Sequence, residues 1–171
     1  MKQKIERKIK TDRKLKSRME IKRTDLKRTD FQSENELKIY LRDFVLDYAS
    51  QMNEIENEIC RREEAEPATD FFPEFKQRYL PVFEAYCSDK QRSYGGQANS
   101  YGSPSKFDSV ENFVEYTVEL KNKNRAEVYF KTANDEDAEY LFVLLRKENL
   151  WRIDSYKDRW YGEEKWNTRI L

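Results

Sequence analysis

The sequence EYLFVLLRKENLWRIDSYKDRWYGEEKW, residues 139–166, decides the fold. Every position from Tyr140 to Leu145 is apolar, so an extended strand here would be apolar on both faces. Such a strand is typical of the interior of a sheet that is covered on both sides. A buried helical segment is the alternative, but the run is short and charged residues bound it, which favours a strand. Glu148 and Asn149 are expected to form the turn that follows.

Three more segments around this strand alternate between apolar and polar residues. Residues 112–120 and 126–132 precede it, and the polar turns KNKNR and ANDED separate the three segments. The strand after it is expected to have two faces, with Trp151, Ile153 and Ser155 opposite Arg152, Asp154 and Tyr156. Turns this short allow only antiparallel pairing, so the four segments predict a meander. Gly162 is expected to end the last strand, and residues 163–171 are expected to form a short helix.

A long amphipathic helix is expected before the strands. Ser33 and Glu36 fit the capping box, in which a serine hydroxyl and a glutamate carboxylate each satisfy a free backbone N–H. Apolar residues then follow at helical spacing as far as about Arg62: Leu37, Leu41, Phe44, Tyr48, Met52, Ile55 and Ile59. Glutamates make the far half of this helix acidic, and Pro67 is expected to end it.

A second, shorter helix is expected after Pro67. Asp70 is a candidate N-cap, and Pro73 suits a first helical turn. An apolar stripe follows at helical spacing: Phe75, Tyr79, Val82, Phe83 and Tyr86. Pro81 lies inside this stripe and is expected to kink or split the helix after Tyr79.

The net charge of zero hides a split between two parts of the chain. Residues 1–30 carry thirteen Lys and Arg against five Asp and Glu, a net charge of +8. The remaining residues carry twenty basic and twenty-eight acidic groups, a net charge of −8. We therefore expect residues 1–32 to be a basic extension, partly helical or disordered, and residues 33–171 to be the folded domain. The extension has no aromatic ring before Phe31 to stack on bases, so direct nucleic-acid binding is not expected.

The residue content argues against several kinds of site. The chain has no histidine, which is the commonest general base and the commonest zinc ligand. Cys60 and Cys87 lack metal-binding spacing and are expected to be free thiols. No apolar run approaches the roughly 20 residues that span a bilayer, and the N-terminus has no signal-peptide core. We expect a cytoplasmic protein with no metal, no cofactor and no membrane partner.

The order of these elements resembles the nuclear-transport-factor-2-like fold, an α+β plan in which N-terminal helices pack on a curved antiparallel sheet and form a cone. More narrowly, the C-terminal half resembles the bacterial immunity proteins built on that fold. The resemblance is carried by AEVYFKT at 126–132, EYLFVLLRKENLWRIDS at 139–155 and the tail YKDRWYGEEKW at 156–166. It covers about residues 33–171 and does not extend to residues 1–30.

The resemblance implies a partner-binding protein that is not an enzyme. Immunity proteins of this kind are encoded beside a polymorphic toxin and neutralise it by direct binding in the cytoplasm of the producing cell. The acidic body suits a toxin with a positive surface, such as a nuclease. Two alternatives remain open: a small enzyme of isomerase or dehydratase type with its site inside the cone, and a non-catalytic dimeric scaffold. A homodimer is also compatible with an immunity function.

Two groups of residues are candidates for a site, and no catalytic residue is assigned. Partner binding is expected from exposed acids and aromatic rings: Glu63, Glu64, Glu66, Trp160, Tyr161 and Trp166. The alternative for the two tryptophans is that they close the lower edge of the core. A pocket inside the cone would be lined by Tyr116, Tyr129, Asp154 and Tyr156. The alternative there is cross-strand packing for the tyrosines and an ion pair for Asp154.

Overall fold

The structure is a computed structural model that describes residues 31–91, 100–133, 137–160 and 162–171. The basic extension of residues 1–30 lies outside the described residues. The helices are α2 (Glu34–Ala65), α3 (Phe72–Tyr86) and the short 3-10 helix η2 (Val110–Asn112). The strands are β1 (Phe113–Asn122), β2 (Arg125–Thr132), β3 (Glu139–Lys147), β4 (Leu150–Arg159) and β5 (Asn167–Arg169). Helices followed by strands give the α+β plan that the sequence predicted.

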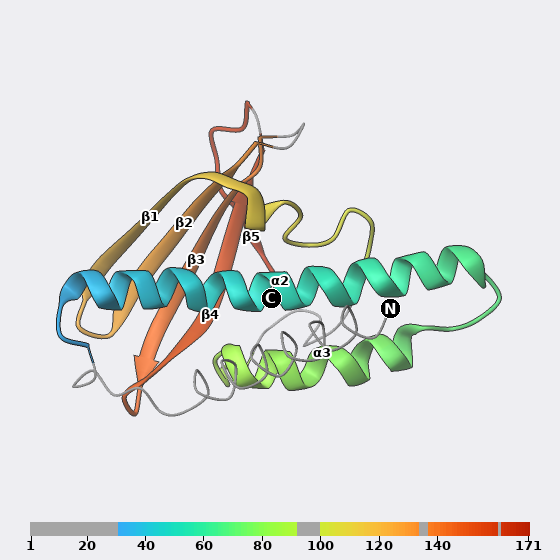
Figure 1. Cartoon of the computed structure of the whole chain (residues 1–171), viewed down its shortest axis with the longest axis horizontal. Helices are drawn as coiled ribbons and strands as arrows, with labels where there is room; N and C mark the ends of the chain where they lie inside the picture. The colour runs from blue at the N-terminus through green and yellow to red at the C-terminus, as the bar shows by residue number, and fades with distance from the viewer. Residues whose placement is uncertain (1–30, 92–99, 134–136, 161) are drawn as a thin grey trace, which may run out of the picture.

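All five strands form one antiparallel sheet in the order β1-β2-β3-β4-β5. The predicted meander is therefore confirmed, and the strand at 139–147 is its central strand. Helix α2 crosses one face of the curved sheet, and α3 runs beside α2 (Figure 1). The inner face of the sheet and the two helices enclose the core between them.

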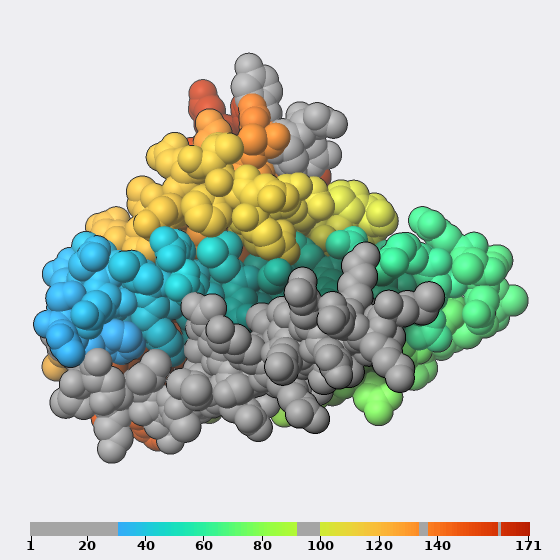
Figure 2. All heavy atoms as spheres, in the orientation of Figure 1, coloured from blue at the N-terminus to red at the C-terminus, as the bar shows by residue number. Residues whose placement is uncertain are grey.

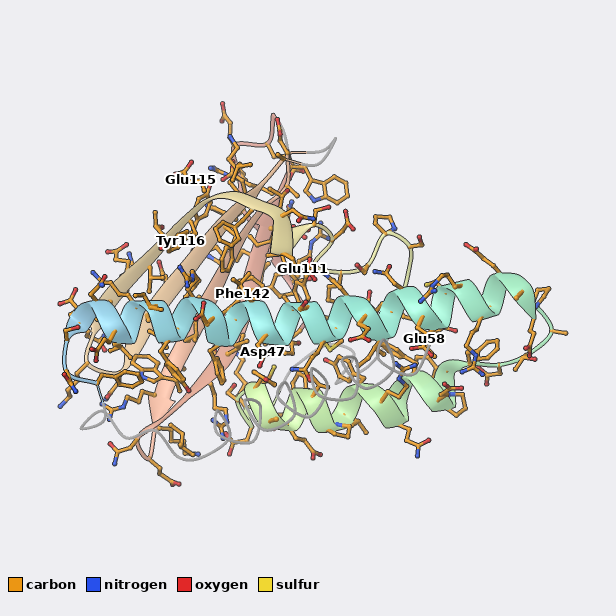
Figure 3. The ribbon with its side chains drawn as sticks, in the orientation of Figure 1. Asp47, Glu58, Glu111, Glu115, Tyr116 and Phe142 are labelled. Carbon is orange, nitrogen blue, oxygen red and sulfur yellow. The ribbon has the colours of Figure 1, made fainter. Side chains whose placement is uncertain are left out.

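Aromatic rings fill much of this core. Phe107, in the segment before β1, has no exposed surface and contacts rings from both layers. Its ring centroid lies 5.5 Å from that of Tyr48 on α2, and 5.4 Å and 5.0 Å from those of Phe142 and Tyr156 on the sheet. The side chain of Phe142 points from the sheet toward α2 (Figure 3). The segment around Phe107 therefore joins the helix layer to the sheet.

The central strand is covered on one face only. Tyr140, Phe142 and Leu144 point inward and are buried. On the outer face Val143 is buried, but Leu141 is half-buried and Leu145 is exposed. The prediction that helices or another layer cover both faces was therefore wrong, because the described helices lie on the inner face (Figure 1). On the outer face the described cover is Trp166 from the tail, whose ring packs against that of Tyr129.

Strand β4 contains a bulge that the sequence pattern did not reveal. Val143 pairs with Ser155 and Leu144 with Ile153, so Asp154 has no partner on β3. Alternation restarts after the bulge, and Tyr156 therefore joins Trp151 and Ile153 on the inner face. The predicted grouping of Tyr156 with Arg152 was wrong for this reason.

The ends of the helices follow local chemistry. Ser33 is the N-cap of α2, and its hydroxyl accepts a hydrogen bond from the Glu36 N–H at 3.2 Å. The Asp70 carboxylate accepts a hydrogen bond from the Phe72 N–H at 3.0 Å, although Phe71 occupies the N-cap position of α3. Helix α3 continues through Pro81, so the predicted split does not occur.

The tail forms a strand instead of the expected terminal helix. β5 pairs with β4 through Tyr156 and Arg169, Lys157 and Thr168, and Asp158 and Asn167. Arg169 Nε donates to both carboxylate oxygens of Asp158 at 2.9 Å. This ion pair and the ladder hold the tail against β4, which is why residues near the C-terminus are extended.

Candidate functional site

The acidic end of α2 projects beyond the sheet. The helix has 32 residues and is about 48 Å long, whereas strands of ten residues span about 33 Å. Its C-terminal half therefore extends past the sheet together with the first part of α3, and forms a protruding end of the molecule (Figures 1 and 2). Glu63, Glu64 and Glu66 lie at this end and are exposed.

These three glutamates differ from the acids nearer the core. Glu58 points toward α3 (Figure 3), where Arg78 Nη2 donates to it at 2.8 Å. Arg62 pairs with Glu74 in the same helix contact. No described residue forms an ion pair with Glu63, Glu64 or Glu66, and their charges therefore face solvent. We call these three residues the acidic tip.

A tyrosine connects the acidic tip to the body. The Tyr101 hydroxyl donates a hydrogen bond to Glu63 Oε1 at 3.2 Å. Its ring lies 4.9 Å from that of Phe75 and 6.4 Å from that of Phe72, both on α3. Burial and the hydrogen bond to Glu63 raise the pKa of Tyr101. The ring also forms one wall of a cleft, so the acidic tip adjoins the rim of that cleft.

The cleft has a volume of about 410 Å³ and lies between α2, the segment 100–108 and the strands β3–β5. Among the described residues, its walls carry four aromatic rings, from Tyr101, Tyr140, Tyr156 and Trp160. The acids and bases of the described lining are Glu56, Asp108, Asp158, Lys106 and Arg169. We call this feature the aromatic cleft.

Glu56 is the most deeply buried acid of the aromatic cleft, with 1% of its surface exposed. Its Oε2 accepts a hydrogen bond from the Lys106 N–H at 2.8 Å. Its Oε1 is buried and has no hydrogen-bond partner among the described residues. Burial raises the pKa of Glu56, and the Lys106 N–H and ammonium group only partly oppose this effect. The hydroxyl of Ser105, which is 4% exposed, likewise has no described partner.

Asn53 holds the loop wall of the cleft against α2. Its Nδ2 donates to the Phe107 carbonyl at 2.7 Å, and its Oδ1 accepts from the Phe107 N–H at 3.1 Å. Its Nδ2 also lies 3.1 Å from Glu111 Oε1. Asn53 is one turn before Glu56 on the same helix, so a single side chain fixes the segment that positions Ser105 and Lys106.

The sheet wall of the cleft is equally well ordered. The hydroxyl of Tyr140 donates to the Asp108 carbonyl at 3.1 Å. Burial, and then the nearby Asp158 carboxylate, raise the pKa of Tyr156 well above its ordinary value. Asp158 is already paired with Arg169. Glu56 Oε1 and Ser105 Oγ are thus the buried side-chain atoms of the cleft that have no hydrogen-bond partner within the described chain.

The two candidate tryptophans of the tail, Trp160 and Trp166, lie at different places on the molecule. Trp160 lines the aromatic cleft and is 47% exposed. Trp166 instead covers the outer face of the sheet, with its ring 6.3 Å from that of Tyr129 and the Arg159 guanidinium 4.6 Å above it. Tyr161 lies outside the described residues. The structure therefore brings Trp160, and not Trp166, near the acidic tip.

The four residues proposed to line a cone occupy different places. Only Tyr156 lines the aromatic cleft. Tyr116 is on the inner face near the edge of the sheet, is 40% exposed and accepts a hydrogen bond from Arg42 at 3.1 Å. Tyr129 lies on the outer face, because it alternates with Val128 and Phe130.

Asp154 and Tyr129 have structural partners where they lie. Asp154 occupies the β4 bulge, where Ser88 Oγ and Lys90 Nζ donate to it at 3.0 Å and 2.6 Å. The Ser88 N–H also donates a hydrogen bond to the carbonyl of Ile153 on β4. This bond fixes the chain just after α3 to the sheet. Tyr129 donates to Glu139 at 2.9 Å, and burial together with this bond raises its pKa to about 12.

The sequence analysis did not single out Glu56, Ser105 or Asn53. A signal for two of them was present, because Asn53 and Glu56 fall among the apolar stripe positions Met52, Ile55 and Ile59 on α2. A polar residue on such a stripe is buried, and a buried polar group needs a partner. Nothing in the local sequence marks Ser105.

The described residues contain neither a cluster of metal ligands nor a membrane-spanning helix. No group of three or more His, Cys, Asp or Glu side chains there is placed to hold a metal ion. None of the helices in that part of the chain is long and apolar enough to cross a membrane. Neither cysteine forms a disulfide; Cys87 is buried and Cys60 is partly exposed.

Comparison with known proteins identifies the family. The family described as NTF2 fold immunity protein matches residues 40–169. No curated protein and no solved structure matches the chain. The matched range includes nearly all of α2, all of α3 and the whole five-stranded sheet. The chain therefore belongs to the NTF2 fold immunity proteins.

Proposed function

We propose that the chain binds and neutralises a cognate toxin domain in the cytoplasm of the cell that produces both proteins. The family match over residues 40–169 is the observation that carries this proposal. The binding unit is residues 33–171, which include all the described helices and strands. The chain acts by occupying a surface of the toxin and needs no turnover.

The toxin is expected to have a basic surface. Residues 31–171 carry a net charge of −8, and the acidic tip holds three carboxylates without a described ion-pair partner. Complementary charge speeds the encounter of two proteins and selects among partners. Nuclease toxins fit this requirement, because they use Lys and Arg to contact the phosphate backbone.

The test uses the C-terminal domain of the toxin encoded beside this gene. The purified protein should bind that toxin domain. Cells that express the toxin domain should survive when they also express this protein. Replacing Glu63, Glu64 and Glu66 together by Lys should lower the association rate constant by roughly tenfold at low salt, because electrostatic steering is lost. The matched control replaces Glu84, Glu148 and Glu164 by Lys, which makes the same change in net charge at scattered exposed positions.

The outcome separates three cases. A slower association for the acidic-tip variant than for the scattered control supports the tip as the steering surface. Equal association rates would remove the tip from the binding surface. If the wild-type protein neither binds nor protects, the immunity function itself is wrong. Sedimentation of the isolated protein measures whether it forms a homodimer, which the immunity function allows but does not require.

One feature favours the enzyme alternative as a second candidate function. Glu56 is a buried carboxyl group with a raised pKa and an unpartnered oxygen in a cleft, as a general acid or base would be. The ratio of protein to toxin needed for protection decides between the two functions. Binding requires about one molecule of this protein per toxin molecule, whereas turnover would protect at a small fraction of that amount.

A further inference from the structure

We propose that the aromatic cleft receives the guanidinium group of one arginine side chain of the toxin, with Glu56 and Ser105 as its hydrogen-bond acceptors. The inference rests on the proposed function, because it names the partner group that one part of the binding surface recognises. It goes beyond that function by assigning a specific anchor site to residues that the charge pattern alone did not identify.

Two buried acceptors without partners are the first argument. Glu56 Oε1 and Ser105 Oγ are both buried and lack described hydrogen-bond partners, and both residues line the cleft, so a small rotation of either side chain would turn these atoms toward it. Buried polar atoms in folded proteins are almost always hydrogen-bonded. A ligand that donates hydrogen bonds into the cleft would satisfy both atoms, and they come from separate elements, α2 and the segment 100–108.

The charges of the cleft favour a cationic ligand. Of its two bases, Arg169 is already paired with Asp158 through both carboxylate oxygens. The ammonium group of Lys106 lies over the ring of Tyr79, 6.0 Å from its centroid, while its backbone N–H binds Glu56 Oε2. Glu56 therefore retains one oxygen for a donor from outside the chain. An anion would face this carboxylate and that of Asp108 and be repelled.

The aromatic walls select arginine among cationic side chains. A guanidinium is planar, carries five N–H donors and stacks on aromatic faces, and it is less strongly hydrated than an ammonium group. The rings of Tyr101 and Trp160 belong to the cleft, and Trp160 is largely exposed in the isolated chain. An inserted arginine would cover this tryptophan and leave the neighbouring acidic tip to steer the approach of other basic groups.

The first experiment measures the dissociation constant of the toxin domain for the wild type and for E56Q. Glutamine keeps an acceptor for the Lys106 N–H but replaces the free oxygen by an N–H donor, so we expect binding roughly thirtyfold weaker. E84Q is the matched control, because Glu84 is exposed on α3 and has no described ion pair. Thermal melting and circular dichroism of each variant show that it is folded.

A second experiment tests the chemistry of the cleft without the toxin. N-acetylarginine amide is titrated into the full-length wild-type protein, and the NMR signals of Ser105, Tyr156 and Trp160 are followed. N-acetylcitrulline amide is the control, since it has the same shape and no charge. We expect saturable shifts at these residues with the arginine compound and none with the citrulline compound.

The results distinguish the two levels of the proposal. If the wild type binds the toxin and E56Q binds equally well, the arginine site is wrong while the immunity function stands. Equal shifts with arginine and citrulline amides, or none with either, would also overturn the site. If the wild type does not bind the toxin, the immunity function fails and the assignment of a toxin arginine fails with it.

Discussion

The substitution N53A tests how the cleft is built. Asn53 is 5% exposed, makes two hydrogen bonds to the backbone of Phe107 and donates to both carboxylate oxygens of Glu111. Alanine removes all of these bonds and cannot replace them. The Phe107 N–H would then remain unpaired, while its carbonyl would keep only the bond from the Val110 N–H at 3.1 Å. The ring of Phe107, which touches both layers of the core, would lose its fixed position.

The size of the effect follows from these groups. A buried polar group left without its partner costs about 1–3 kcal/mol. The unpaired Phe107 N–H costs this amount, and the bond lost by the Phe107 carbonyl, which keeps the Val110 N–H, costs about 0.5–1.5 kcal/mol more. Together they predict a loss of about 2–4 kcal/mol in the free energy of unfolding. Alanine has a higher helix propensity than asparagine, which offsets up to about 0.7 kcal/mol of this loss.

Urea unfolding followed by tryptophan fluorescence measures the loss. The control is N57A, one turn along α2, where the side chain is exposed. It makes the same change in helix propensity and should leave stability unchanged or slightly raise it. The difference between the two variants is therefore the contribution of the buried hydrogen bonds. A difference below about 1 kcal/mol would refute the claim that Asn53 anchors the segment.

Three more predictions concern single positions. The first is E56Q. The difference in free energy of unfolding, E56Q minus wild type, should increase from pH 4 to pH 7 when both proteins are unfolded by chemical denaturant. Burial raises the folded-state pKa of Glu56 above 4.5, so the folded wild type binds more protons than the unfolded chain and loses stability as pH rises; a pH-independent difference would contradict this. P81A should raise stability by about 1–3 kcal/mol, since alanine restores a backbone N–H inside a continuous helix, and an unchanged melting temperature would count against it. G162A should lower stability by about 1 kcal/mol, because Gly162 has φ of +82°, which a residue with a side chain adopts only at a cost. The loss should be no larger, because a Cβ there would meet no atom within 4 Å. A loss several times larger would contradict this explanation.

Local signals in the sequence predicted most of the framework. The Ser33 cap, the stripe on α2 and the turns between strands act over a few residues, and the structure keeps them. The apolar run of β3 likewise identified the central strand. These features are predictable because hydrogen bonds and side-chain periodicity within one helix, strand or turn determine them. They do not depend on which other element packs against that segment.

The features that the sequence did not predict depend on contacts between distant segments. The bulge at Asp154 coincides with the docking of Ser88 and Lys90 from the end of α3. Strand β5 depends on the pairing of Arg169 with Asp158. The cleft depends on Asn53, which binds a segment 54 positions away in the chain. The partners of these contacts are 64 to 66, 11 and 54 positions apart, and none of the contacts belongs to a repeat within one helix or strand, so side-chain periodicity does not reveal them.

The length of α2 relates the fold to the proposed mode of binding. Its first part packs on the sheet, and its C-terminal end projects beyond the sheet with the acidic tip (Figure 1). Glu56 lies between them, in the cleft that the ends of β3–β5 help to line. Glu56 and Glu66 are ten positions apart, or about 15 Å along the helix axis. A standard interface buries about 800 Å² on each partner and is wide enough to include both. One face of a toxin can therefore meet the steering acids and the cleft together. Because the tip glutamates are exposed and Glu56 is buried, tip substitutions should change association without changing stability, while substitution of Glu56 should change both.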